Sequence, residues 1–252
     1  MLAPRIAARL DIKGSNVVKG IRFEGLRIIG SPAALARQYT ESGADEIFYT
    51  DIVASLYGRS LDYKIVESVA KQTFLPLTVC GGIRSLDDVQ VALRHGADKV
   101  AINTAALERP RLIDEIALAY GSQCITVSVE AKRRSQDRWE AYTLGGRQVT
   151  GVNVLDWVVE AEKRGAGEIL LNSVDQDGTG RGFDLDLVTA VRSKISIPLF
   201  VSGGAGSIDH VESLFASREV EAIACATLLH KQQDSLGKIK QALKKKHIEV
   251  RA

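Results

Sequence analysis

The sequence predicts an α/β protein that folds as a single (β/α)8 TIM barrel with an internal two-fold half-barrel repeat. Short β-branched runs alternate with longer amphipathic stretches about eight times, and one half of the chain repeats motifs of the other. The length of 252 residues fits this architecture, because closed eight-stranded α/β barrels usually need ~250 residues. We therefore expect residues 1–252 to form one domain.

The individual elements are predicted from hydrophobic periodicity. The expected strands are residues 6–12, 47–50, 77–79, 100–102, 125–129, 169–171, 199–201 and 222–224. The expected helices are residues 33–42, 61–72, 86–94, 110–120, 154–164, 185–192, 209–217 and 236–246. Alternating strands and helices form parallel sheets covered by helices, which leaves an open sheet or a closed barrel as candidates.

An internal repeat decides between these two architectures. Gly43-Ala44 recurs 122 residues later as Gly165-Ala166, and at the same offset Gly81-Gly82 matches Gly203-Gly204. No linker or change in composition separates the halves. Two half-barrels that close into one unit explain this pattern better than two separate domains.

The composition excludes several functional classes. The chain has 33 Lys and Arg residues against 31 Asp and Glu residues, a net charge of +2, whereas a nucleic-acid-binding surface needs a clustered cationic excess. No apolar run approaches the ~20 residues of a membrane span, and the N-terminus leads into a strand rather than a signal sequence. We therefore expect a cytoplasmic protein with neither nucleic acid nor a membrane among its partners.

The cysteines and histidines show no spacing typical of cross-links or metal sites. Cys80, Cys124 and Cys225 lie in or beside apolar strand-like runs without paired spacing, so buried free thiols are expected. The four histidines share no metal-ligand pattern. We expect neither a metal site nor a cofactor.

Two glycine turns follow the third and seventh strands. These are Gly81-Gly82 and Ser202-Gly203-Gly204, and small polar residues, Asn103 and Thr227, follow the fourth and eighth strands. Adjacent glycines let backbone N–H groups approach an anion, and barrels commonly bind phosphate after strands seven and eight. The glycines could instead only make tight turns, but their duplication favours two phosphate sites and a substrate with a phosphate at each end.

Acidic residues occur at many strand ends. They are Asp11, Asp51, Glu130, Asp175 and Asp177. In a barrel these positions meet at one mouth. There, repulsion between carboxylates and partial burial can move their pKa values apart, so that one group acts as an acid and another as a base. Because Asp11 and Glu130 begin the two halves, they should face each other. The pattern predicts acid–base chemistry without a covalent nucleophile.

Two long segments interrupt the strand–helix alternation. Residues 13–30 contain Lys19 and are too long for a simple connection, which is typical of an active-site lid. Lys19 either meets a substrate phosphate or carbonyl oxygen or is solvated. Residues 131–146 form an Arg-rich, hairpin-like insertion directly after the fifth strand.

The combined motifs resemble the cyclase subunit of imidazole glycerol phosphate synthase nearly end to end. Those that carry the likeness include Leu10-Asp11-Ile12-Lys13, Val17-Val18-Lys19-Gly20, Cys80-Gly81-Gly82-Ile83-Arg84, Asp175-Gln176-Asp177-Gly178-Thr179 and Ser202-Gly203-Gly204-Ala205-Gly206. The resemblance implies a lyase of histidine biosynthesis. Such an enzyme uses ammonia to convert a bisphosphate phosphoribulosyl-formimino aminoimidazole carboxamide nucleotide into imidazole glycerol phosphate and aminoimidazole carboxamide ribotide.

The resemblance also implies roles for particular residues. Asp11 would be the general base, Glu130 the general acid and Lys19 the lid lysine. The substrate-binding and phosphate-binding positions would be Gly82, Asn103, Asp177, Gly178, Ser202, Gly204, Ala226 and Thr227. A glutaminase partner would dock at the N-terminal face and send ammonia through a charged gate formed by Arg5, Glu46, Lys99 and Glu168. These four residues could instead make ordinary ion pairs at the base of the barrel.

Three positions depart from the family pattern. Glu130 stands where the family has aspartate, Asn172 where it has threonine, and Arg9 where cysteine is usual. Two alternatives therefore remain: a duplicate whose substrate has changed, such as an ammonia-accepting subunit in surface-sugar amidine formation, or a catalytically idle subunit that activates a glutaminase.

Overall fold

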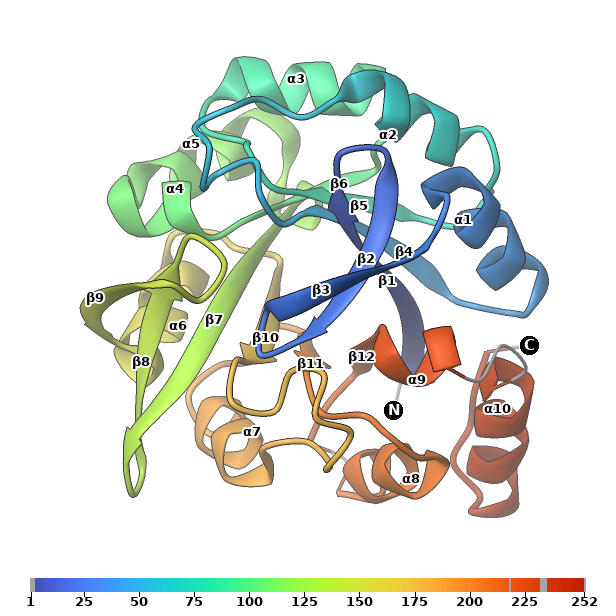
Figure 1. Cartoon of the computed structure of the whole chain (residues 1–252). Coiled ribbons are helices and arrows are strands. Elements are labelled where there is room, and N and C mark those ends of the chain that lie inside the picture. The colour runs from blue at the N-terminus through green and yellow to red at the C-terminus, as the bar shows by residue number, and fades with distance from the viewer. Residues whose placement is uncertain (1–2, 218, 232–234, 252) are drawn as a thin grey trace.

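The parallel strands of the computed structural model close into a ring with helices outside it (Figure 1). The structure describes residues 3–217, 219–231 and 235–251. Within these ranges the barrel strands, in spatial order, are β1 (Arg5–Lys13), β4 (Glu46–Asp51), β5 (Leu77–Cys80), β6 (Lys99–Ile102), β7 (Ile125–Ser135), β10 (Glu168–Ser173), β11 (Leu199–Ser202) and β12 (Ala222–Cys225). Neighbours are parallel throughout, and pairing of β10 with β7 and of β12 with β1 closes the ring. The predicted TIM barrel is confirmed.

The helices cover the outer face of the barrel. Among the described residues they are α1 (Pro32–Glu41), α2 (Tyr63–Ala70), α3 (Leu86–Arg94), α4 (Thr104–Glu108), α5 (Arg111–Tyr120), α6 (Val154–Lys163), α7 (Leu185–Arg192), α8 (Ile208–Ala216), α9 (Thr227–Lys231) and α10 (Ser235–Lys245), with a 3-10 turn at Ser122–Cys124. The sequence did not predict α4 and α9, because five-residue helices are too short to show a helical period. Within the described ranges, no helix has the length and apolar character needed to span a bilayer.

The internal repeat is visible in matching helix caps. The Ser85 hydroxyl accepts a hydrogen bond from the Asp88 backbone N–H at the start of α3, and Ser207 accepts one from the His210 backbone N–H at the start of α8. Each such N-cap is worth about 1 kcal/mol to its helix. Both capped helices follow a glycine turn, so the two halves present these turns to the barrel mouth in the same way.

The structure corrects the prediction for the first long segment and confirms the hairpin-like character of the second. Residues 13–30, expected as a long loop, form a hairpin of β2 (Asn16–Ile21) and β3 (Glu24–Gly30), which lies across the barrel in Figure 1. The insertion forms a small antiparallel sheet with β8 (Arg138–Thr143) and β9 (Gln148–Asn153). Both barrel strands run on into these hairpins, so Asp11 and Glu130 lie within strands rather than after them.

Alternation along the strands arranges the interior in layers. Successive side chains of a strand point to opposite faces, so the odd-numbered residues of β1 point inward and Ile6, Ala8 and Leu10 pack beneath the helices. The middle layer is a small apolar cluster of Ala7, Phe48, Leu170, Phe200, Ala222 and Ala224. A charged layer lies on one side of this cluster and a polar layer on the other, at the mouth.

Candidate active site

A network of alternating charges lies at the carboxyl ends of the strands. Arg9 Nε donates to Asp11 Oδ1 at 2.8 Å, and Lys19 Nζ donates to Asp11 Oδ2 at 2.9 Å. Lys19 Nζ also contacts both carboxylate oxygens of Asp177 at 3.0 Å. The β2 strand therefore brings Lys19 directly onto the predicted acids, where its side chain is only 10% exposed.

These cations control the protonation of Asp11. Burial alone raises the pKa of this carboxyl, but the charges of Arg9 and Lys19 outweigh burial and lower the pKa to about 2. Asp11 is therefore a carboxylate at neutral pH. Both its oxygens accept hydrogen bonds from cations, which stabilise the ionised form and make Asp11 a weaker base while both cations remain in place.

Glu130 has the opposite environment. It lies on β7, four places around the ring from β1, so it approaches the mouth from the side opposite Asp11. Burial raises its pKa to about 7, although Gly146 N–H donates to Oε2 at 2.7 Å. Two carboxyl groups at one mouth, one ionised and one with a pKa raised to about 7, form the arrangement expected of a base and an acid.

The larger cavity of the mouth encloses the first glycine turn. It has about 850 Å³ of empty space, and its lining includes Arg9, Cys80, Gly81, Gly82, Asn103, Thr104 and Glu130. Gly82 has φ +67°, and a Cβ there would lie 2.9 Å from the carbonyl oxygen of Arg59. Only glycine fits this close approach, and the buried Gly82 lines the cavity at this tight turn.

A smaller cavity, with about 240 Å³ of empty space, is lined by the second set of predicted residues. Its lining includes Lys19, Asp177, Gly178, Ser202, Gly204, Ala226 and Thr227. At Gly204, which has φ +103°, a Cβ would lie 1.9 Å from the carbonyl oxygen of Gly182. The predicted substrate-binding residues thus gather in two groups, one for each half of the barrel.

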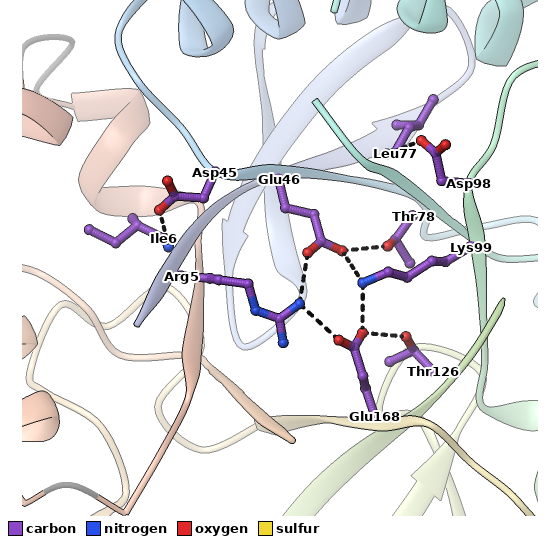
Figure 2. A network of polar contacts seen from close by, with 10 residues as sticks. All are labelled: Arg5, Ile6, Asp45, Glu46, Leu77, Thr78, Asp98, Lys99, Thr126 and Glu168. Carbon is purple, nitrogen blue, oxygen red and sulfur yellow. Dashed lines mark hydrogen bonds and ion pairs between the residues drawn. The ribbon is translucent and has the colours of Figure 1, made fainter. Parts of the chain in front are cut away.

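The opposite end of the barrel carries a closed ring of ion pairs, which Figure 2 shows. Arg5 Nη1 contacts Glu46 at 3.2 Å and Glu168 at 2.8 Å, and Lys99 Nζ contacts the same carboxylates at 3.1 and 3.0 Å. Thr78 and Thr126 donate hydrogen bonds to these two acids. The four residues predicted as a gate therefore meet on the barrel axis, below the apolar cluster.

The carboxylates of two of the acids expected at the mouth accept hydrogen bonds from backbone N–H groups. Asp51 accepts hydrogen bonds from the Val53 and Ala54 backbone N–H groups and pairs with Arg59. Asp175 accepts from the Arg133 backbone N–H. Backbone N–H groups and Arg59 thus bind these two carboxylates, although Asp51 also lines the larger cavity of the mouth.

Sequence reasoning noted Arg9 only as a departure and did not include it in the site. The available signal was its spacing: residues 9 and 11 of one strand point to the same face. His230 lies in α9, where its Nδ1 forms a hydrogen bond of 2.6 Å with Tyr39 Oη. All three cysteines are free and buried, as predicted. In the described ranges, no cluster of three or more His, Cys, Asp or Glu side chains is arranged to hold a metal ion.

Comparison with known proteins identifies a consistent group of relatives. The sequence pattern of a family described as "Histidine biosynthesis protein" matches residues 5–235. The imidazole glycerol phosphate synthase subunit HisF of Legionella pneumophila is 55% identical over 205 residues, which cover 81% of this chain and 97% of that protein. The same subunit of Myxococcus xanthus is 45% identical over 252 residues (100% and 99% of the two chains), and that of Streptococcus mutans serotype c is 44% identical over 251 residues, covering 100% of both.

Proposed function

Because the chain belongs to the histidine biosynthesis protein family, we propose that it is the cyclase subunit of imidazole glycerol phosphate synthase. As a lyase it uses ammonia to convert the phosphoribulosyl-formimino aminoimidazole carboxamide ribonucleotide into imidazole glycerol phosphate and aminoimidazole carboxamide ribotide. The observation that carries the proposal is the pair of glycine-lined cavities on opposite halves of one mouth. Glu130 lines the larger cavity, and Asp11 is bound by Lys19, which lines the smaller one.

The two cavities fit the two ends of an elongated bisphosphate. Gly82 and Asn103 bind one phosphate in the larger cavity, and Gly204 and Thr227 bind the other in the smaller cavity. Backbone N–H groups at glycine turns and helix N-termini are suited to phosphate oxygens. The reactive centre of the substrate then lies between the cavities, within reach of both carboxyl groups.

The carboxyl groups divide the proton transfers between them. Glu130, whose pKa of about 7 leaves it partly protonated at neutral pH, donates a proton to the carbonyl oxygen when ammonia adds to the substrate. That oxygen takes a second proton from the added nitrogen and leaves as water, which forms an imine. The imine nitrogen then bonds to the formimino carbon, and the bond from this carbon to the aminoimidazole carboxamide ribotide breaks as the leaving nitrogen takes up a proton. Asp11, ionised, accepts the proton that the attacking nitrogen loses. Lys19 lines the smaller cavity, so an incoming phosphate draws its ammonium group away from Asp11 and frees the base.

Ammonia enters from the opposite end of the barrel. A glutaminase subunit docks at the N-terminal face and releases ammonia beneath the ring of Arg5, Glu46, Lys99 and Glu168. The apolar cluster above the ring, where Phe48 and Phe200 meet edge to face at 5.1 Å, favours neutral ammonia over ammonium, because burial of an unpaired charge is costly. Passage requires the ion pairs to open.

Turnover of the bisphosphate nucleotide by the isolated chain with excess ammonium tests this function. We expect Asp11→Asn and Glu130→Gln each to reduce kcat by about 100-fold or more, the usual contribution of a positioned acid or base. Glu41→Gln is a matched control, since Glu41 pairs with Arg37 on the surface of α1 and is far from the mouth in sequence and topology. Absence of product above background would reject the assignment.

The two alternatives lack support from the comparisons, because the relatives are named as subunits of imidazole glycerol phosphate synthase. They also differ in their outcomes. A subunit with a changed substrate would show no gain in cyclase turnover for Glu130→Asp. An idle glutaminase activator would keep every activity in Asp11→Asn.

A further inference from the structure

Arg9 is the least expected member of the polar layer at the mouth. Its side chain is 5% exposed and lies inside a closed barrel, directly above the apolar cluster. Nε donates to Asp11 at 2.8 Å, and Nη1 donates to the Ser202 hydroxyl at 3.3 Å. Arg9 also lines the larger cavity with Cys80 and Glu130. A buried guanidinium thus contacts the proposed base, the second phosphate site and the cavity of the proposed acid.

We propose that Arg9 is a positioning residue that keeps Asp11 ionised and oriented after Lys19 has moved to the substrate phosphate. The inference rests on the proposed function, which assigns Asp11 as the base. Two cations hold Asp11 in the structure, and they come from different elements. Lys19 lies on the hairpin that crosses the mouth, whereas Arg9 lies two residues from Asp11 on the same barrel strand.

The hydrogen bonds of Arg9 suit it to this role. A guanidinium donates in a fixed planar arrangement, so the bond to Ser202 on β11 restrains the plane that also contacts Asp11. Asp11 can then release Lys19 without losing its orientation. A neutral side chain at position 9 would leave a buried carboxylate without a charge partner once Lys19 departs, which favours its protonated and inactive form.

Arg9 acts on Glu130 as well as on Asp11. Burial raises the pKa of Glu130, and the charge of Arg9 opposes this increase, so loss of Arg9 should raise the pKa further. Among the described residues, other titratable or charged groups interact electrostatically with Arg9 or Asp11. They are Lys19 on β2, Asp177 after β10, Cys80 on β5 and His230 on α9.

The test compares Arg9→Met and Arg9→Lys in the full chain, with the nucleotide as substrate and with total ammonium adjusted at each pH to keep free ammonia constant. For Arg9→Met we expect kcat to fall about 10- to 100-fold, as for a small misplacement of a catalytic group. In the pH profile of kcat/KM, the alkaline limb reports loss of the Glu130 proton, and its midpoint should shift to higher pH by about one unit. KM for the nucleotide should stay within about threefold of the wild-type value. Arg9→Lys keeps the charge and should leave the limb in place.

Arg192→Met is the matched control. Arg192 is a partly buried arginine that pairs with the carboxylate of Glu221 at 3.2 Å, outside the mouth. Arg192→Met should leave kcat and the alkaline limb of the pH profile unchanged. Thermal unfolding of all variants separates loss of folding from loss of catalysis.

The outcomes are distinct. If Arg9→Met leaves both kcat and the limb unchanged, or raises KM alone, the positioning role is refuted while the proposed function stands. If Glu130→Gln retains the wild-type limb, the assignment of Glu130 as the acid fails whatever Arg9 does.

Discussion

Glu130→Gln should have a higher free energy of unfolding than the wild type, and this difference should increase as pH rises. The pKa of Glu130 is raised from 4.5 to about 7 in the folded chain. The folded state therefore binds this proton more tightly than the unfolded state, and the free energy of unfolding falls as pH rises from about 4.5 to about 7. Glutamine has the shape of the protonated acid and lacks this penalty.

The raised pKa sets the size of the effect. A shift from 4.5 to about 7 corresponds to about 3 kcal/mol at pH values above the folded pKa, at 1.36 kcal/mol per unit. Glu130 is only half-buried and faces a cavity that is open to solvent, so screening by water reduces the expected value to about 2 kcal/mol. Glu130→Gln should gain this much over the wild type between pH 4.5 and pH 8.

Urea unfolding of both proteins at several pH values provides the measurement. The difference between the two proteins is the informative quantity, because His230 titrates in the same window with the opposite sign: burial lowers its pKa to about 4, so its contribution to stability increases with pH. This contribution is common to both proteins and cancels. A difference that does not change between pH 4.5 and pH 8 would refute the raised pKa of Glu130.

Two further predictions concern the ends of the barrel. Glu46→Gln removes one of the two carboxylates that share Arg5 and Lys99; we expect a loss of roughly 3 kcal/mol in urea unfolding, as for other broken buried ion pairs. If the ring gates ammonia, the ratio of glutamine-supported to ammonium-supported turnover should also fall at least about tenfold, and an unchanged ratio would leave the ring a purely structural role. Gly204→Ala places a Cβ 1.9 Å from a carbonyl oxygen at φ +103°, so KM for the nucleotide should rise at least about tenfold. Gly237→Ala meets nothing within 4 Å on α10 and should instead stabilise the fold by up to about 1 kcal/mol; equal effects of the two substitutions would contradict a specific role for the turn.

Much of the architecture was predictable because its signals are local or repeated. Alternating β-branched and amphipathic segments located the eight barrel strands within a few residues, and the 122-residue repeat selected a closed barrel. The glycine turns could be found because backbone that approaches another carbonyl so closely, as at Gly82, accepts no other residue. The helices α4 and α9 and the β2–β3 hairpin escaped prediction, since they are short or depend on pairing with the barrel.

The sequence by itself determined which residues stand at strand ends and which face of each strand they occupy, since a strand alternates with a period of two and a repeat copies its motifs. It therefore placed Asp11, Glu130 and both glycine turns at one mouth. Only the tertiary structure decided that Arg9 and Lys19 share Asp11, that Asp51 and Asp175 bind loop backbone, and that burial raises the pKa of Glu130 to about 7. These properties depend on distances and burial between strands that are far apart in the chain, and such distances are fixed only when the ring closes.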